Sequence, residues 1–251
     1  MPRFFVPGEG FDGEYVSITG DDAWHIARSL RMAVGESITV CDTRGDEHIC
    51  TLQRITDALV TARIEESLAS AGEMPLGVVL YQALPKGDKM DLIVQKAVEM
   101  GADRIVPFLS ERCVSRPDGA SLEKKCARWQ RIALEAAKQC GRGRVPTIGA
   151  PLSYTQMLAD AGEASLGCFC YEGDGTVSLR TLLGERRQSL APKGDRKDIA
   201  LVIGSEGGFS EREAASASEA GLVLCGLGKR ILRCESASGF ALACISYEFE
   251  L

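Results

Sequence analysis

The chain has 251 residues, of which 45% are apolar and 25% charged, and its net charge is −6 at pH 7. This length allows one large domain or two modest ones, and the composition is ordinary for a globular protein. No run approaches the roughly 18 apolar residues that span a bilayer, and the first residues hold no apolar segment long enough for a secretory signal. We therefore expect a cytoplasmic protein without membrane contact.

The first 70 or so residues are expected to be mostly strand. Three segments are short, β-branched and partly alternating: 37–41, 48–52 and 59–64. Turn-forming residues 42–46 join the first two as a hairpin. One helix is expected to begin at Asp21 or Asp22 and to carry apolar residues at helical spacing: Trp24, Ile26 or Ala27, Leu30 and Val34. Short strands with turns predict a small barrel, and residues 67–73 are typical of a linker.

From residue 76 the pattern alternates between strand and helix. Expected strands cover 77–81, 104–109, 166–171, 199–203 and 222–224. Expected helices cover 90–100, about 122–140, a segment that starts at Ser210, and 236 to about 247. Ser210 and Glu213 have the spacing of a capping box. The alternation predicts an α/β fold whose mostly parallel sheet is covered on both faces.

Cysteine and histidine do not indicate a metal site. The chain has ten cysteines but no C-x-x-C pair, and the closest two are Cys168 and Cys170. Neither His25 nor His48 has a cysteine or carboxylate neighbour at metal-ligand spacing. Cysteines scattered through apolar runs are usually small core residues in a reducing compartment. We expect neither a metal nor a disulfide.

The charges are unevenly distributed. Residues 1–72 hold six Lys/Arg and twelve Asp/Glu, whereas residues 104–144 hold ten Lys/Arg and four Asp/Glu. A solvated helix face is the simplest interpretation of the basic segment. The negative total does not exclude an RNA partner, because binding depends on the local patch.

Two glycine-containing segments, 202–210 and 227–237, each follow a short apolar run and precede an expected helix. Strand-to-helix turns are where open α/β sheets usually bind small ligands. The first segment lacks the phosphate-binding fingerprints and contains Glu206, so it suits an uncharged or cationic ligand, although an ordinary tight turn has the same pattern. The second segment places three cations beside Glu235, which suits an anionic or polarisable substrate: Lys229, Arg230 and Arg233.

These segments occur together with five further motifs, at residues 2–5, 25–32, 86–91, 95–101 and 139–142. In this combination the chain resembles, over essentially its whole length, the methyltransferases that modify N3 of a uridine in small-subunit (16S) ribosomal RNA. That family lies within the SPOUT superfamily.

The resemblance implies a PUA-like β-barrel at residues 1–72 and a SPOUT methyltransferase domain at residues 73–251. It also implies a trefoil knot in the C-terminal region and a homodimer. S-adenosylmethionine is the implied cofactor, and its pocket would be formed by Tyr171, Glu172, Ile203, Gly204, Glu206, Gly207, Leu227, Gly228, Ile231 and Leu232. The chain departs from the family at Ser205 and Lys229, where proline is usual, at Cys234, where threonine is usual, and at Lys138, where an acidic residue is usual.

The resemblance also suggests roles in catalysis and RNA binding. Arg233 or Arg230 would stabilise the anionic base, and Glu235 would act as a base or as an orienting group. An Arg–Glu pair that only holds the loop stays open as the alternative. Because N3 lies on the Watson–Crick edge, the target base must be unpaired when it reacts. The expected RNA contacts are Arg3, Arg28, Arg31, Lys86, Arg112, Arg142, Arg144 and Arg230.

Two alternatives stay open. One is a SPOUT enzyme that modifies a different RNA, such as the ribose of a tRNA. The other is an RNA-binding ribosome-assembly factor of the same fold with weak or no catalysis. The sequence also leaves open whether free RNA or the assembled small subunit is the substrate.

Overall fold

The computed structural model describes residues 1–43, 45–190 and 198–251. Contacts divide the chain into two compact units, one of Met1–Glu73 with Ala137–Val145 and one of Met74–Ala136 with Pro146–Leu251. Residues 137–145 therefore pack with the first unit, although the expected domains assigned them to 73–251. The PUA-like and SPOUT domain bounds themselves stay a prediction, as does the trefoil knot.

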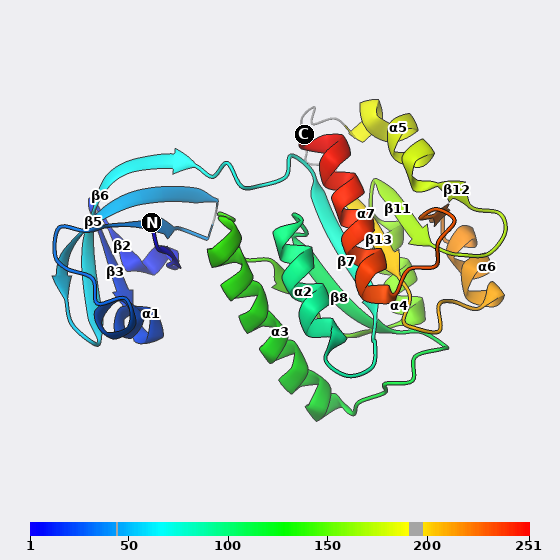
Figure 1. Ribbon diagram of the computed structural model, residues 1–251, viewed down its shortest axis with the longest axis horizontal. Coiled ribbons are helices and arrows are strands. Elements are labelled where there is room, and N and C mark those ends of the chain that lie inside the picture. Colours follow the sequence, from blue (N-terminus) through cyan, green and yellow to red (C-terminus); the bar gives the residue numbers. More distant parts are fainter. Residues whose placement is uncertain (44, 191–197) are drawn as a thin grey trace. The chain divides into compact units, whose positions relative to one another are not determined.

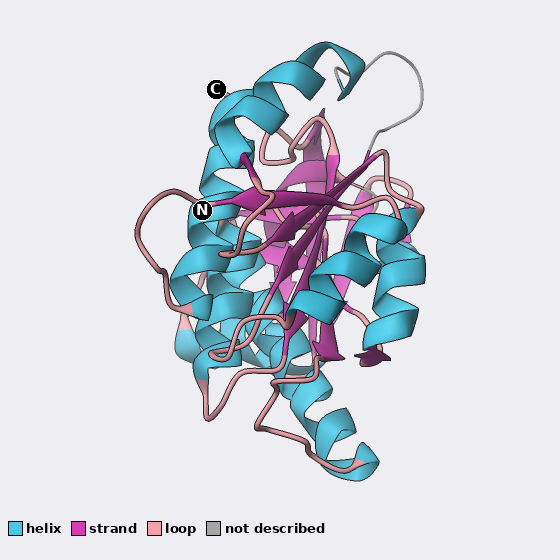
Figure 2. Cartoon of the chain, turned by 90° about the vertical axis from the view of Figure 1, so that its right-hand side faces the viewer, coloured by secondary structure: helices cyan, strands magenta, loops and turns pink. Residues whose placement is uncertain are grey.

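In the described part of the second unit, eight strands form one parallel sheet, with helices on both of its sides (Figures 1 and 2). The strands are β7 (Gly77–Ala83), β8 (Arg104–Leu109), β9 (Thr147–Ile148), β10 (Leu152–Ser153), β11 (Leu166–Cys170), β12 (Val177–Ser178), β13 (Asp198–Ile203) and β14 (Val223–Gly226). The helices are α2 (Lys89–Glu99), α3 (Gly119–Cys140), α4 (Tyr154–Gly162), α5 (Leu179–Leu190), α6 (Glu211–Glu219) and α7 (Cys234–Phe249). The mostly parallel sheet predicted from the sequence is confirmed.

The strand order is β10-β8-β7-β13-β11-β14-β12, with β9 paired to β8, and every pairing is parallel. β13 lies near the middle, and its residues Ile199–Ile203 are all buried. A continuous apolar run is what a strand covered on both faces requires. The carboxyl ends of β13, β11 and β14 consequently lie at the same edge of the sheet.

The elements predicted for this unit agree with the structure to within a few residues. The capping box of α6 is present, because the Ser210 hydroxyl accepts from the Glu213 N–H and the Glu213 carboxylate accepts from the Ser210 N–H. The sequence analysis missed α4 and α5. The signal for α4 was available, since Ser153 and Gln156 form a second capping box at its start. Among the described residues no helix is both long and apolar enough to cross a bilayer.

The first unit contains a six-stranded sheet of order β1-β4-β5-β6-β3-β2, in which only the β1–β4 pair is parallel. Its elements are β1 (Arg3–Phe5), β2 (Phe11–Asp12), β3 (Tyr15–Thr19), α1 (Gly20–Trp24), β4 (Ser37–Cys41), β5 (Asp46–Ile55) and β6 (Leu59–Ala69). Irregular pairing at two points of β5 bends the sheet around one core. That core includes Phe4, Val16, Ile18, Ile26, Ile38, Val40, Leu52 and Val60.

The helix predicted from Asp21 or Asp22 to Val34 is wrong in its length. The α-helix ends at Trp24 and continues as one π-helical turn over His25–Ser29, after which Arg31 has a φ of +52°. Of the apolar residues expected on one helical face, Ile26 is buried, whereas Trp24, Leu30 and Val34 are exposed, the last two after the wider turn has broken the helical spacing. Exposed apolar residues at these positions were not expected.

The predicted hairpin between 37–41 and 48–52 is confirmed by antiparallel pairing of β4 and β5. In its turn the Asp42 carboxylate accepts from the N–H groups of Gly45 and Asp46, both at 3.1 Å. Arg44 of this turn lies outside the described residues. The expected linker at 67–73 is shorter than predicted, because β6 continues to Ala69.

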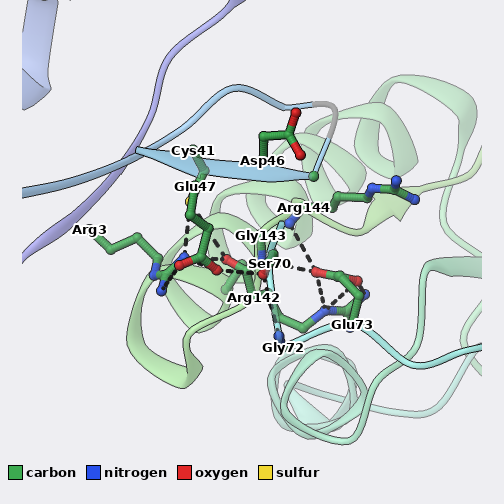
Figure 3. Close-up of polar contacts among 12 residues, drawn as sticks. Arg3, Cys41, Asp46, Glu47, Ser70, Gly72, Glu73, Arg142, Gly143 and Arg144 are labelled. Atoms are coloured by element: carbon green, nitrogen blue, oxygen red, sulfur yellow. Dashed lines mark hydrogen bonds and ion pairs between the residues drawn. The ribbon is translucent and has the colours of Figure 1, made fainter. Parts of the chain in front are cut away.

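Glu73 attaches the segment 137–145 to the rest of the first unit (Figure 3). Its carboxylate accepts from the Arg142 guanidinium at 2.7–3.1 Å and from the N–H groups of Gly143 and Arg144 at 2.9 and 3.0 Å. The Arg142 and Glu73 side chains are only 4% and 14% exposed. The segment is thus held by a largely buried ion pair.

Arg142 and Arg3 were both expected to contact RNA phosphates, but the structure gives them internal partners. Arg142 is buried against Glu73, and its carbonyl accepts from the Arg3 guanidinium at 3.3 Å. Arg3 also pairs with Glu47 at 2.8 Å, and both side chains of this pair are largely buried. A guanidinium already saturated by a buried carboxylate is not available to a phosphate, so we assign these two arginines a structural role.

Replacing Arg142 should therefore destabilise the first unit. Arg142→Met leaves the Glu73 carboxylate buried without its cation, and we expect a loss of about 3 kcal/mol in the free energy of unfolding. Arg63→Met is the matched control, because the Arg63–Glu65 pair is 48% and 36% exposed and its loss costs about 1 kcal/mol or less. Urea unfolding measures both variants, and equal losses would contradict this assignment.

Candidate active site

The turn after β13 runs from Gly204 to Phe209 and is compact. The Gly208 N–H donates to the Ser205 carbonyl at 3.0 Å, and Gly208 has a φ of +61°, a conformation that favours glycine. A Cβ on Gly204 would lie 3.1 Å from the Gly208 Cα, so a side chain here would have to push the Gly208 backbone aside by a few tenths of an ångström. The Phe209 ring anchors the turn by packing on Phe169, with ring centroids 4.2 Å apart.

Gln82 ties this turn to the neighbouring strand β7. Its side chain is fully buried, and its amide N–H groups donate to the carbonyls of Gly204 at 3.1 Å and Ala83 at 3.0 Å. The turn is therefore held both by its own backbone and by the sheet beneath it.

The second glycine-containing segment leads from the end of β14 to α7. Gly228 has a φ of +107°, which residues with a side chain rarely adopt. A Cβ there would meet no atom within 4 Å, so the glycine faces open space. At the end of the segment the Arg233 carbonyl accepts from the N–H groups of Ser236 and Ala237, both at 2.8 Å, and so begins α7.

These two segments and the residues after β11 enclose a cavity of about 460 Å³. This volume suits a small-molecule ligand. The lining residues are Lys89, Cys170, Tyr171, Glu172, Thr176, Ile203, Gly204, Ser205, Glu206, Gly208, Phe209, Gly226, Leu227, Gly228, Lys229, Arg230, Ile231, Leu232, Arg233, Cys234 and Ala237.

Three of the lining residues are exposed cations: Lys229, Arg230 and Arg233. Within the described residues no hydrogen bond or ion pair engages any of their side chains. Unpaired cations beside a cavity attract negative charge and are free to donate to a ligand. The wall at this point therefore favours an anionic partner.

Lys89, at the start of α2, faces two carboxylates. Its Nζ is 2.8 Å from Glu206 Oε1 and 3.6 Å from Glu235 Oε2. Burial opposes ionisation of both carboxyls, but the hydrogen bonds and the nearby ammonium outweigh it and lower the pKa of Glu206 and of Glu235. The hydrogen bond to Glu206 raises the pKa of Lys89. All three groups are consequently ionised near neutral pH.

The Cys234 thiol donates to the Glu235 carboxylate at 3.2 Å. Burial, together with this hydrogen bond, raises the pKa of Cys234 to about 12. A thiol with this pKa stays protonated at neutral pH and is a poor nucleophile. Covalent catalysis by Cys234 is therefore disfavoured.

Nine of the ten residues expected to bind a cofactor line the cavity. The exception is Gly207, whose carbonyl accepts from the Arg112 guanidinium at 3.0 Å. Of the two catalytic candidates, Arg233 lines the cavity. Glu235 does not line it, but its Oε2 lies 3.6 Å from the Nζ of Lys89, which does. Sequence reasoning assigned no role to Lys89 or to the Ser205 hydroxyl.

The remaining RNA-contact candidates are exposed, but their surroundings differ. Arg28 is bound by Asp57 through two hydrogen bonds of 2.8 and 2.6 Å, whereas Arg230 lies at the cavity. Lys86 is exposed, and its backbone N–H donates to Glu206 at 3.1 Å. Arg31 and Arg144 are exposed residues of the first unit. Their roles in RNA binding stay a prediction.

The cysteines are free thiols, and Cys170 Sγ lies 3.7 Å from Cys225 Sγ. Over residues 1–43, 45–190 and 198–251 no three His, Cys, Asp or Glu side chains are grouped as metal ligands.

This chain belongs to the RNA methyltransferase family, because the family model described as "RNA methyltransferase domain" matches residues 72–246. A second family model, described as "RNA methyltransferase PUA domain", matches residues 18–65.

The chain is similar to proteins named ribosomal RNA small subunit methyltransferase E. The protein from Bacillus subtilis is 37% identical over 94% of this chain and 91% of its own length. The protein from Synechocystis is 34% identical over 97% of this chain and 77% of its own length.

Solved structures agree with these relatives. The methyltransferase E of Neisseria gonorrhoeae, crystallised with bound S-adenosylmethionine, is 31% identical, covers 98% of this chain and 97% of its own, and has a TM-score of 0.83. A methyltransferase of Legionella pneumophila, also solved with this cofactor, is 31% identical, covers 98% of this chain and 96% of its own, and has a TM-score of 0.82. The expected fold class is confirmed apart from the knot.

The turn after β13 should not tolerate even a methyl group. Gly204→Ala places a Cβ against the Gly208 backbone, and we expect a loss of about 1–3 kcal/mol in the free energy of unfolding. Gly184→Ala is the control: at this helical position in α5 a Cβ would meet no atom of the described residues within 4 Å, and alanine there should stabilise by about 0.5–1 kcal/mol. If both variants had the same melting temperature, the described packing of the turn would be wrong.

Proposed function

We propose that this protein methylates N3 of a specific uridine in 16S ribosomal RNA, with S-adenosylmethionine as methyl donor. The observation that carries the proposal is the cavity itself, which gathers nine of ten expected cofactor residues from separate segments and has three exposed cations in its wall. Membership of the RNA methyltransferase family and similarity to small-subunit methyltransferases support it. We also propose that the protein acts in the cytoplasm, where small ribosomal subunits are assembled.

The cavity suits the proposed donor for two physical reasons. Ser205 is 6% exposed and lines the cavity, and its hydroxyl has no hydrogen-bond partner in the described structure. A buried hydroxyl without a partner is costly, and a polar ligand atom would satisfy it. Gly228 faces open space, so a ligand can approach the backbone closely at that point. When bound, S-adenosylmethionine supplies a methyl group activated by a sulfonium.

The chain's own residues would bind and polarise the uracil. N3 carries a proton at neutral pH, so the reacting base becomes anionic, and a cation near its carbonyl oxygens stabilises that charge. Arg233 fits this role because its guanidinium is exposed at the cavity without a hydrogen bond to any described residue. Lys89 fits it less well, because its nearest acceptors are protein carboxylates.

Glu235 is better suited to orientation than to proton removal. Its lowered pKa makes its carboxylate a weak base toward a group that is still protonated at neutral pH. Holding the unpaired base against the donor would then supply much of the acceleration. We propose Arg28, Arg31, Lys86, Arg112, Arg144 and Arg230 as phosphate contacts that position the RNA.

We further propose that the protein is a homodimer and that α7 forms part of the interface. Four residues of α7 share one exposed face at helical spacing: Ser236, Phe240, Ala243 and Tyr247. Phe240 is 42% and Tyr247 72% exposed, while the opposite face of this helix is buried in the core. A helix that is apolar all round is usually covered on every side, and a second copy of the chain would cover this face.

Two alternatives remain. An RNA-binding assembly factor without catalysis would explain the basic residues, but it would not need an open cavity lined by glycines and cations. Calorimetry with S-adenosylmethionine distinguishes these, since a catalytically silent factor need not bind the donor. A methyltransferase for a different RNA would show the same cavity, and only the position of the modified base identifies it.

Mass-spectrometric mapping of 16S RNA tests the proposed function. RNA from cells without this gene should lack one 3-methyluridine that returns when the gene is restored. Arg233→Ala should fail to restore it, with activity reduced about 100-fold or more, because one donor to a developing oxyanion is worth about that factor. Arg180→Ala, which removes an exposed arginine of α5, is the control. Normal methylation with Arg233→Ala would exclude Arg233 from the mechanism, and an unchanged map without the gene would refute the function.

The dimer is tested by the mass of the protein in solution. Phe240→Glu combined with Tyr247→Glu should convert a dimer into a monomer in analytical ultracentrifugation, because it places charges on the apolar face of α7. Val114→Glu changes an apolar residue that is 69% exposed elsewhere and should leave the dimer intact. A wild-type monomer, or a dimer that survives both substitutions, would contradict this interface.

A further inference from the structure

Lys89 stands where three segments around the cavity meet. It begins α2, and its ammonium reaches Glu206 in the turn after β13 at 2.8 Å and Glu235 in the first turn of α7 at 3.6 Å. Lys89 and Glu206 line the cavity. One side chain thus connects parts of the chain that are far apart in sequence.

Each carboxylate also accepts from uncharged donors. Glu206 accepts from the Lys86 N–H at 3.1 Å, and Glu235 accepts from the Cys234 thiol at 3.2 Å. These bonds orient the two carboxylates but bring no cation to them. Without Lys89 the two negative charges, whose oxygens lie 2.8 and 3.6 Å from its ammonium, would repel each other.

Lys89 contributes to the arrangement of the site more than to global stability. The side chains of Lys89, Glu206 and Glu235 are 32%, 29% and 16% exposed, so solvent screens the ion pairs. Partly exposed pairs typically contribute less than about 1 kcal/mol to folding. A free-energy change of that size is still measurable as a change in ligand affinity, because the two ion pairs join the turn after β13 and the start of α7, which form the binding site.

We propose that Lys89 is a positioning residue of the methyl-donor site, whose ammonium holds Glu206 and Glu235 together and thereby keeps the turn after β13 against the start of α7. The inference rests on the proposed function, because donor binding is its readout. In this proposal Lys89 positions other residues of the site, whereas Arg233 contacts the substrate.

The proposal has a pH signature. Lys89, the Glu206 N–H and the Lys86 N–H lower the pKa of Glu206, and the Glu235 N–H, Cys234, Lys89 and Arg233 lower that of Glu235. In the wild type both carboxyls have a pKa below the ordinary value of 4.5, so their contribution to binding is complete above that pH and is lost only as pH falls further. Removing Lys89 leaves burial in place, and burial raises a carboxyl pKa. The loss of binding should then begin at a higher pH.

The experiment compares Lys89→Met with Lys89→Arg and with Lys96→Met. Lys96 pairs with Glu99 at 2.6 Å on the same helix and does not line the cavity, so it controls for loss of an ion pair. Calorimetry with S-adenosylmethionine should show about two- to fivefold weaker binding for Lys89→Met near neutral pH and a wider gap on acidification. Lys89→Arg should restore most of the affinity, and Lys96→Met should behave as the wild type.

A second readout does not depend on the donor. In the ligand-free chain, carbon NMR titration of the glutamate carboxyls should show the pKa of Glu206 and Glu235 rising in Lys89→Met. Unchanged carboxyl titration, or weaker binding with the same pH profile as the wild type, would overturn the proposal. If the carboxyls shift as expected but the wild type binds no donor, the pairing is supported and the proposed function is refuted.

Discussion

Parallel pairing of three neighbouring strands is the constraint on which the candidate site depends. β11 lies between β13 and β14 and pairs in parallel with both. Parallel strands end at the same edge of a sheet, so the segments that leave these strands must begin side by side. A cavity of about 460 Å³ results at that edge, although its walls come from distant parts of the chain. Changing the direction of any of the three strands would disperse the site.

The backbone of the two late segments then decides what the cavity can hold. Gly204 packs tightly against Gly208, and Gly228 has a positive φ beside open space. The backbone is therefore accessible at Gly228, and the Ser205 hydroxyl, which has no partner among the described residues, adds a polar group that a ligand can satisfy. The wall also carries the Lys89–Glu206 ion pair and three exposed cations, Lys229, Arg230 and Arg233. Both signs of charge are therefore present around the cavity.

Much of the fold could be predicted from the sequence because its signals were local. Short, continuous apolar runs predicted β7, β8 and β13, and the capping box of Ser210 and Glu213 predicted the start of α6. The π-helical turn after Trp24 could not be predicted in this way, because helical spacing assumes one repeat throughout. Nothing local reveals that residues 137–145 pack with the first unit through Glu73 and Arg142, since this ion pair joins positions remote in sequence.

In the candidate site, too, features with a local sequence signal could be predicted, and contacts between remote residues could not. Glycines and cations in two short segments were readable, and nine of the ten expected pocket residues lie together. Lys89 was not readable as part of the site, because its two carboxylates belong to other segments. The burial of Arg142 could not be predicted, because a basic residue in a basic segment gives no sign that it is buried.

The most direct test of the central claim is a crystal structure of the protein grown with S-adenosylmethionine or its demethylated product. The account predicts density for the ligand between residues 203–209 and 226–234, with a polar ligand atom in reach of the Ser205 hydroxyl. Well-defined density at any other place, with this cavity left to solvent, would contradict it.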